Sequence, residues 1–376
     1  MAKTVSVGEV AAKAGETKWG PATWVEARDS TRVGLQVIIV NGAKDGPKVV
    51  LCGATHPTEL SGTAVIHDLT RNKLNPAELK GTIIAFPIAN PLAMQFGRYV
   101  SPHDGANLAV SYPGSKNGSI TSRIANFIWN EATLGADLIT DLHENVSPCL
   151  LFSLVGTCKD KQVERRTLQL AEAFGLTVIR TGGADLGTPG TKGGDLYWAE
   201  EGMASGIPGF TVELEGSFES RFDGSQPTVQ IGVRGVMNTL KTLGMIEGRL
   251  ESQDRTLVLE GEYSAWGSIR ANRGGLVNRF VDTGVRLRKG TRIAEVINPY
   301  GEVVETIRMP IDGFIWAWTI IGPDNPNWCV QLVPPLRTYF MRSEASAFLT
   351  QMADADSEFR RVKGELKSRG SLAKKG

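Results

Sequence analysis

The sequence contains few cysteines and few histidines, four of each among 376 residues. No C-x-x-C pair occurs. Cys52, Cys149, Cys158 and Cys329 lie within or next to apolar runs, which favours free thiols in a reducing compartment over a disulfide framework. Because histidines are so few, each one can be weighed individually as a ligand.

The chain also lacks the segments that mark exported or membrane proteins, and it lacks an excess of charge. Its start, Met-Ala-Lys-Thr-Val-Ser, has no apolar core of the kind found in signal peptides, and no apolar run approaches the length of a membrane span. We therefore expect a cytoplasmic protein without a membrane partner. The formal net charge is +1, so nucleic acid is not an expected partner either.

The pattern of apolar and turn-forming residues changes along the chain and predicts two domains and a tail. In residues 1–248, short apolar runs alternate with segments of helical spacing, which is typical of an α/β domain. In residues 249–340, short strands and turns dominate, which predicts a smaller all-β domain. Residues 341–376 are charged and have helical stretches, so we expect a surface or docking helix with a frayed end.

A histidine and a glutamate stand three residues apart where a predicted strand is followed by a predicted helix. The run from Lys48 to Cys52 is typical of a buried strand, and Leu60 to Leu69 has apolar residues at near-helical spacing. In α/β proteins, functional sites collect at this end of the strands. His56 and Glu59 are therefore candidate metal ligands, one through an imidazole nitrogen and the other through a carboxylate oxygen.

A third candidate ligand, His143, lies in a second predicted strand, Ala136 to Asn145. The carboxyl ends of strands in a parallel or mixed sheet meet at one edge, so His143 can join His56 and Glu59 there. Two histidines and one glutamate form a catalytic zinc triad that leaves a fourth position for water. Asp141 points to the same side of its strand as His143 and can orient that ligand.

Hydrolysis by such a site also requires a carboxylate that moves a proton from water to the leaving group. Glu213 lies near the end of a predicted strand that starts at Gly209, and it is the best candidate for this base. Glu215 is two residues further on and on the same strand face, so strand periodicity does not separate the two.

Five short motifs occur in a particular order along the chain. They are His56-Pro57-Thr58-Glu59, Asn90-Pro91 with Arg98, Asp104-Gly105-Ala106-Asn107-Leu108 running to Tyr112-Pro113-Gly114, Asp141-Leu142-His143, and Gly209 to Glu213. In this order the sequence resembles the succinylglutamate desuccinylase/aspartoacylase family, zinc-dependent N-acyl amino acid amidohydrolases related to metallocarboxypeptidases. The match spans Thr23 to Leu243, and the β segment resembles the family's C-terminal domain.

The resemblance implies a fold, a cofactor and a reaction. The fold would be a mixed-sheet, zinc-carboxypeptidase-like α/β domain with a smaller all-β C-terminal domain. His56, Glu59 and His143 would bind one Zn²⁺ per chain, Glu213 would be the general acid/base, and Arg98 would polarise the scissile carbonyl. The reaction would be hydrolysis of a C–N amide bond in a small N-acyl compound, with zinc-bound water as nucleophile.

Four further residues are candidate substrate contacts. Asn107, Asp104 and Tyr112 belong to a segment of little periodicity, which is often functional inside a compact domain, and Glu144 follows His143 directly. For Asn107 and Asp104, a role as turn-forming residues is as good an interpretation as contact with substrate.

One departure from the family pattern bears on the substrate, whereas Pro57 in the His-x-x-Glu motif alters only the turn between the candidate ligands. After Asp-Gly-x-Asn-Leu the family has Asn-Arg, a pair that grips the substrate's carboxylate, whereas this chain has Ala109-Val110. We hypothesise that the substrate lacks the usual carboxylate, or that another cation binds it. The candidate cations are Arg123, Arg180, Lys192 and Arg221.

Two other functions stay open at this point. One is a carboxypeptidase acting on peptides, which a wide groove would favour. The other is a non-catalytic metal- or ligand-binding protein, which the absence of the Asn-Arg pair would favour. The sequence leaves both a monomer and a homo-oligomer open.

Overall fold

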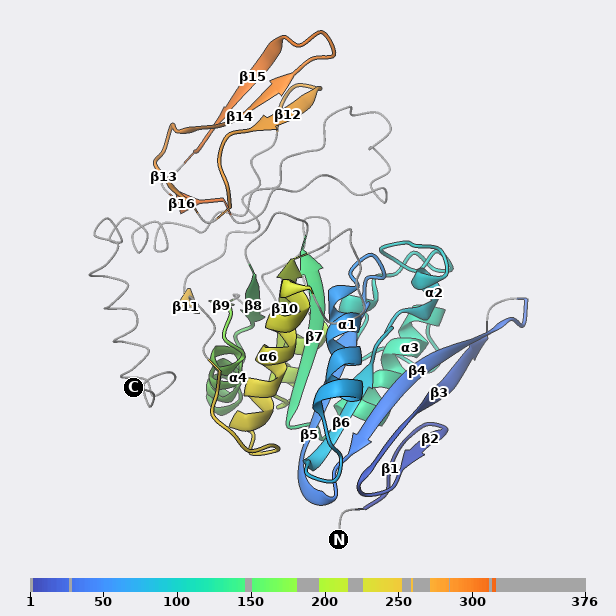
Figure 1. Cartoon of the computed structure of the whole chain (residues 1–376). Helices are drawn as coiled ribbons and strands as arrows, with labels where there is room; N and C mark the ends of the chain where they lie inside the picture. Colours follow the sequence, from blue (N-terminus) through green and yellow to red (C-terminus); the bar gives the residue numbers. More distant parts are fainter. Residues whose placement is uncertain are drawn as a thin grey trace. The chain divides into compact units, whose positions relative to one another are not determined.

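The computed structural model describes residues 3–26, 29–145, 151–180, 196–215, 226–251, 258–259, 271–283, 285–310 and 313–315. The described residues up to Val258, apart from Asn145, form one compact unit, and those from Leu259 on belong to a second (Figure 1). The predicted tail at 341–376, together with Cys149, Cys329, Lys192 and Arg221, lies outside the described residues.

Among the described residues, nine strands form one mixed sheet with the order β11-β9-β8-β10-β7-β5-β6-β4-β3. β5 pairs in parallel with β6 and β7, and β8 with β9, whereas β4 pairs antiparallel with β3 and β6, and β10 with β8. The strands are β3 (Glu16–Glu26), β4 (Arg32–Asn41), β5 (Lys44–Gly53), β6 (Lys80–Phe86), β7 (Leu138–Asn145), β8 (Phe152–Val155), β9 (Thr177–Arg180), β10 (Gly209–Glu215) and β11 (Val258–Leu259).

The apolar pattern of each strand matches its place in the sheet. β5 is central and parallel to both neighbours, and its residues Val49 to Gly53 are all buried, as expected for a strand covered on both faces. β4 lies next to the edge strand, and buried Val33, Leu35 and Val37 alternate with more exposed residues. The sequence therefore encodes which strands are central.

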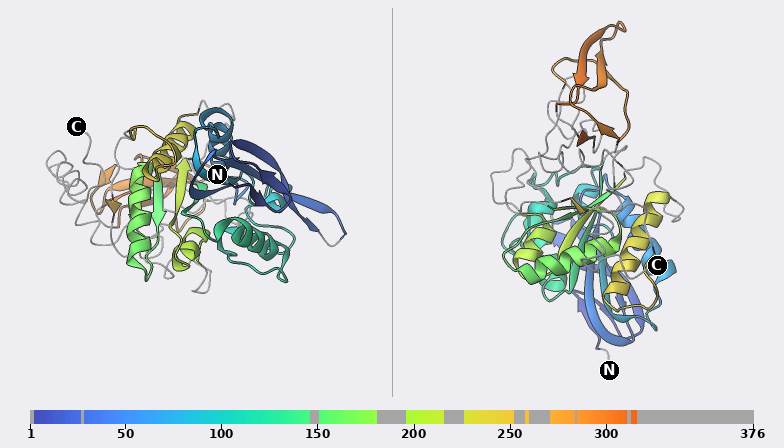
Figure 2. Two further views of the ribbon diagram at one scale, coloured as in Figure 1. Left: turned by 90° about the horizontal axis from the view of Figure 1, so that it is seen from below. Right: turned by 90° about the vertical axis from the view of Figure 1, so that its left-hand side faces the viewer.

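Helices cover both faces of the sheet (Figures 1 and 2). One face packs against α1, α4 and α6, and the other packs against α3, η3 and the short hairpin β1–β2. The helices are α1 (Ser61–Asp68), η1 (Leu69–Lys73), α2 (Pro91–Met94), η2 (Leu108–Val110), α3 (Ile120–Ile128), η3 (Trp129–Thr133), α4 (Lys161–Phe174), α5 (Trp198–Ala204) and α6 (Pro227–Thr242), and the hairpin strands are β1 (Val5–Val7) and β2 (Val10–Ala12). In the described residues, no helix is both long enough and apolar enough to span a bilayer.

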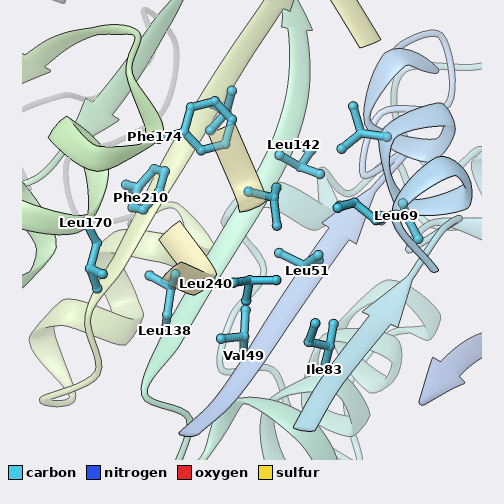
Figure 3. Packing of buried hydrophobic residues seen from close by; sticks show 14 of the residues in the cluster. Val49, Leu51, Leu69, Ile83, Leu138, Leu142, Leu170, Phe174, Phe210 and Leu240 are labelled. Atoms are coloured by element: carbon cyan, nitrogen blue, oxygen red, sulfur yellow. The ribbon is translucent and has the colours of Figure 1, made fainter. Parts of the chain in front are cut away.

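The larger core cluster joins α1, α4 and α6 to the central strands (Figure 3). Phe174 of α4 and Phe210 of β10 meet edge to face with ring centroids 5.9 Å apart, and both side chains are fully buried. Such large buried side chains contribute about 1.5–3 kcal/mol each through burial alone. This core holds rigid the strands that carry the candidate site.

One glycine sets how closely α1 approaches β7. A Cβ placed on Gly62 would lie 2.7 Å from the Cβ of Leu142 and would also clash with the carbonyl oxygen of Leu142. The absence of a side chain at Gly62 therefore lets the start of α1 rest directly on β7. This contact brings the residues that precede α1 next to the end of β7.

The second unit contains a small β-structure. β12 (Leu276–Arg279), β14 (Arg292–Ile297) and β15 (Val303–Arg308) form an antiparallel three-stranded sheet, and β13 (Arg286–Leu287) pairs with β16 (Gly313–Phe314). The buried residues of this unit form a separate core: Leu287, Ile293, Ala294, Val296, Ile307, Met309 and Ile315. The described part of the chain thus has the predicted mixed α/β sheet and a small C-terminal β-sheet.

Candidate metal and catalytic site

Three neighbouring strands deliver the candidate residues to one edge of the sheet. β7 lies between β5 and β10, and Cys52 and Gly53 of β5 are in register with Asp141 and Leu142 of β7. In Figure 1 the arrows of β7 and β10 end at the same edge of the sheet. The loop after β5, the end of β7 and the end of β10 therefore converge, as the sequence predicts.

The carboxylate of Glu59 lies between two imidazole rings. Its Oε1 is 2.9 Å from Nδ1 of His56, and its Oε2 is 2.7 Å from Nδ1 of His143. One ligand atom from each of these three residues lies within 4.8 Å of the other two. All three side chains are shielded from solvent, with exposed fractions of 3%, 13% and 5% for His56, Glu59 and His143. The structure brings the predicted triad together.

The outer nitrogen of each imidazole faces an oxygen atom. Nε2 of His56 is 3.0 Å from Oδ1 of Asn107. Nε2 of His143 is 2.8 Å from Oδ2 of Asp141, a close charge contact that is not aligned as a hydrogen bond. Asp141 in turn accepts a 2.8 Å hydrogen bond from the Thr55 hydroxyl. These contacts match the outer partners that orient metal-ligating histidines, and they leave both Nδ1 atoms directed at the centre of the triad.

The donor set fits a zinc ion. Two imidazole nitrogens and one carboxylate are ligands that Zn²⁺ accepts, and three protein ligands leave one position for a reactant. Burial alone would raise the pKa of Glu59, but the charges of His56 and His143 and their hydrogen bonds lower it to about 2. Burial opposes the charged form of His143, yet Asp141 and Glu59 raise its pKa well above the ordinary value. Both shifts favour the charged forms of Glu59 and His143, which lie side by side in the triad.

Glu213 belongs to the same charged cluster. Burial raises its pKa to about 8, with His143 opposing the rise and the carboxylates of Glu59, Asp141 and Glu144 adding to it. The side chain of Glu215 lies outside the described residues. The role of Glu213 as the base stays a prediction, and its position beside the triad is compatible with that role.

Glu144 has contacts that the sequence did not predict. Its Oε1 accepts a hydrogen bond from the backbone N–H of Ser61, in the first turn of α1, and its own N–H donates to Oε2 of Glu59 over 3.3 Å. Leu60, which precedes α1, has no side chain able to cap the helix, so Glu144 supplies that acceptor from β7. Burial raises the pKa of Glu144 to about 7. Glu144 therefore ties the end of β7 to the loop of Glu59, and its contact with substrate stays a prediction.

Asp104 and Asn107 both have local structural contacts. The Asp104 carboxylate accepts hydrogen bonds from the hydroxyl and the N–H of Thr121, at 2.8 and 2.9 Å, and thus holds the first turn of α3. Oδ1 of Asn107 accepts from the N–H of Ala109 over 3.0 Å in addition to facing His56. Their predicted roles as substrate contacts stay predictions, but Asn107 lies beside the candidate ligand His56.

Tyr112, the other candidate substrate contact, lies in the core. Its side chain is 7% exposed, its ring lies 5.7 Å from that of Trp198, and its hydroxyl has no hydrogen-bond partner among the described residues. Burial, together with the charges of Cys52 and Asp141, raises the pKa of Tyr112 well above the ordinary value. The hydroxyl is thus neutral and near Asp141, and its contact with substrate stays a prediction.

Arg98 lies in an exposed turn after α2, where its N–H donates to the carbonyl of Ala93 over 3.1 Å. The next residue, Tyr99, stacks on the His56 imidazole with ring centroids 3.7 Å apart and planes 19° apart. The sequence analysis did not single out Tyr99, and its only signal was its position next to Arg98. The stacking places the turn that carries Arg98 beside the triad.

Fold and site define a mixed α/β protein with a candidate metal centre at the carboxyl edge of its sheet. The family model "Succinylglutamate desuccinylase/Aspartoacylase catalytic domain" matches residues 45–239, slightly more than half of the chain. The chain therefore belongs to the succinylglutamate desuccinylase/aspartoacylase family, as the resemblance of its motifs predicts. Membership in this family indicates an amide-cleaving deacylase.

Individual relatives agree with this assignment. The N-alpha-acetyl-L-2,4-diaminobutyric acid deacetylase of Halomonas elongata is 27% identical over 279 residues, which cover 72% of this chain and 77% of that protein. A solved succinylglutamate desuccinylase/aspartoacylase from Rhodobacter sphaeroides is 25% identical, with a TM-score of 0.66 over 80% of this chain and 90% of that one. A succinylglutamate desuccinylase from Silicibacter sp. TM1040 shares the fold, with a TM-score of 0.69 at 20% identity over 86% of this chain and 92% of that one.

Proposed function

We propose that this chain is a zinc-dependent hydrolase that cleaves the C–N amide bond of a small N-acyl compound. The observation that carries the proposal is the Glu59 carboxylate held between the Nδ1 atoms of His56 and His143, in a chain of a deacylase family. The relative from Halomonas elongata is named for removing an acetyl group from a small diamino acid, which supports the same type of bond.

His56, Glu59 and His143 would hold one zinc ion through two nitrogens and a carboxylate. When bound, zinc supplies a Lewis acid that polarises a carbonyl and makes a water molecule more acidic. Asn107 and Asp141 would keep the two imidazoles oriented through their Nε2 atoms.

Glu213 is proposed as the group that moves the proton. Its carboxylate takes a proton from water as the water oxygen attacks the carbonyl carbon. It then gives that proton to the amide nitrogen as the C–N bond breaks, so the products are a carboxylic acid and an amine. The raised pKa of Glu213 favours the second transfer, and a cation nearby favours the carboxylate needed for the first. Arg98 is proposed to support the negative charge that develops on the carbonyl oxygen.

The residues at Ala109-Val110 support a substrate that differs from the usual acyl amino acids. Ala109 is fully buried and Val110 is half-buried, and neither can provide the charge of the family's arginine. Of the alternative cations, Arg180 is paired with Glu164, and Arg123 donates to the carbonyl oxygen of Glu26 over 3.4 Å. We therefore keep the hypothesis in both its forms: the substrate lacks the carboxylate which the Asn-Arg pair binds, or another cation binds that carboxylate.

The proposal is tested by metal removal and by a matched pair of glutamate variants. Chelation should abolish amide hydrolysis and Zn²⁺ should restore it. Glu213→Gln should keep zinc and lower turnover by about 10²–10⁴-fold, the usual share of general acid–base catalysis, and Glu215→Gln is the control. Full activity in thoroughly demetallated protein would refute the zinc mechanism. Near-normal turnover of Glu213→Gln with loss in Glu215→Gln would move the base to residue 215.

A further inference from the structure

One segment, residues 91–110, contacts the His56 imidazole twice. It begins with α2, whose first turn is capped by the Asn90 side chain accepting from the N–H of Ala93 over 3.1 Å, and it ends with η2. Tyr99 from the middle of this segment stacks on the His56 ring, and Asn107 from its end faces Nε2. Two residues of this segment therefore contact the candidate ligand His56, one at a face of its ring and the other at Nε2.

The turn that carries Tyr99 is itself held by backbone hydrogen bonds. On its N-terminal side, the N–H groups of Gly97 and Arg98 donate to the carbonyls of Met94 and Ala93 over 3.2 and 3.1 Å. On its C-terminal side, the buried Ser101 accepts from the N–H of Gly105 over 2.8 Å. Tyr99 is thus presented by a defined backbone and not by an open loop.

An imidazole ring needs such support because its outer torsion is soft. The χ2 angle of histidine has a broad energy profile, so neighbours decide the ring plane. Contacts at Nδ1 and Nε2 fix the in-plane direction of the His56 ring but resist its tilt only weakly. The Tyr99 ring, with its centroid 3.7 Å away and nearly parallel, covers one face of the imidazole and opposes that tilt.

We propose that Tyr99 is a positioning residue for the zinc ligand His56, acting through the stacked ring and not through its hydroxyl. The inference rests on the proposed zinc site and adds a third support to the ligand, beside Glu59 and Asn107. The direction of the Nδ1 lone pair determines how well His56 binds zinc, so the aromatic ring contributes to metal affinity.

Zinc affinity of the purified full chain tests this without any substrate. The variants are Tyr99→Leu, which removes the ring, and Tyr99→Phe, which keeps it. The matched control is Phe96→Leu, because Phe96 is an exposed aromatic residue of the same turn whose ring packs on His103, with centroids 5.6 Å apart. Tyr99 is 38% exposed, so its truncation should leave the fold intact, as circular dichroism would show.

The dissociation constant for Zn²⁺ is measured by competition with a chromogenic chelator. Tyr99→Leu should bind Zn²⁺ about tenfold more weakly, whereas Tyr99→Phe and Phe96→Leu should stay within about twofold of the parent chain. The visible absorption spectrum of Co²⁺-loaded protein should change in Tyr99→Leu and be restored in Tyr99→Phe. If Tyr99→Leu failed to fold, Tyr99→Met would take its place.

Unchanged zinc affinity in Tyr99→Leu would overturn the inference. Equal loss in Tyr99→Leu and Tyr99→Phe would also overturn it, because the hydroxyl would then be responsible. These results differ from a failure of the proposed function, which would show as absent zinc binding by the unaltered chain.

Discussion

Replacing Asp141 by asparagine isolates the contribution of one charge to the metal centre. Asp141 is 2% exposed, and its Oδ2 lies 2.8 Å from Nε2 of His143. Asparagine has nearly the same shape and can place its single oxygen at that nitrogen, with its NH2 group donating to the Thr55 hydroxyl oxygen. The substitution therefore removes the negative charge while it keeps the packing and the acceptor.

The size of the effect follows from two estimates. Two unit charges about 4 Å apart attract by about 4 kcal/mol at an effective dielectric constant of about 20. This energy is the upper limit for the zinc-binding free energy that is lost with the charge of Asp141. Because the amide keeps an acceptor, we expect the lower end of the usual range for outer partners of metal ligands, about a tenfold loss in zinc affinity. A tenfold loss corresponds to about 1.4 kcal/mol.

The loss should depend on pH in a defined direction. Asp141 and Glu59 raise the pKa of His143, so zinc binding at this ring would compete with a proton. Asp141→Asn lowers the pKa of His143 and thereby weakens this competition at low pH, which offsets part of the lost affinity. As pH rises through the pKa of His143, the competition disappears and the full loss is seen. The affinity ratio of parent to variant should therefore grow as pH rises from about 6.5, the ordinary pKa of histidine, through the raised pKa of His143.

The assay is Zn²⁺ competition with a chelator at several pH values. The control is Asp137→Asn, because Asp137 immediately precedes the opposite end of β7, is exposed, and accepts from the N–H of Lys48 over 2.7 Å. That variant should bind zinc like the parent chain. Equal zinc affinity of Asp141→Asn and the parent at high pH, or a ratio that shrinks as pH rises, would refute the reasoning.

Two remaining predictions concern Asn107 and the substrate. Asn107→Leu should weaken zinc binding about tenfold and lower the free energy of unfolding by about 1 kcal/mol, because it removes both the acceptor at Nε2 of His56 and the cap of η2. Competition with a chelator measures the zinc affinity, and urea unfolding measures the stability. A variant with lower stability but unchanged zinc affinity would show that Asn107 only caps η2. Because Ala109-Val110 lacks the arginine clamp, hydrolysis of N-acetylaspartate and succinylglutamate should be slow beside that of an N-acyl amine without the clamped carboxylate. Steady-state kinetics on the three amides would measure their relative turnover. Rapid turnover of either acidic compound would refute the hypothesis that the substrate lacks the clamped carboxylate.

The presence of strands that alternate with helices could be predicted because it rests on local pattern. The continuous apolar run of β5 and the alternation in β4 predict strands, and the strands alternate with amphipathic helices, so a sheet with sites at its carboxyl edge follows. His56, Glu59 and His143 were placed at that edge from the sequence, and the structure brings them together.

The partners of those ligands were harder to predict. Asn107 stands 51 positions from His56, in a segment without periodicity, and no rule of spacing connects the two. The contact of Glu144 with substrate stays a prediction, and its capping of α1 from the end of β7 was not predicted. The stacking of Tyr99 on His56 depends on the path of the turn after α2, which propensities do not specify.

By itself, then, the sequence determined the family, the mixed α/β sheet and the identity of the candidate zinc ligands, because these depend on local patterns and on residue types that occur in a fixed order. Only the tertiary structure decided which nitrogen of each histidine faces the triad, that Asn107 faces the other nitrogen of His56, and that the Tyr99 ring covers His56. Those features arise where segments far apart in the chain pack within 3–4 Å of one another. That proximity is set by close contacts such as Gly62 against β7, which no single stretch of sequence contains.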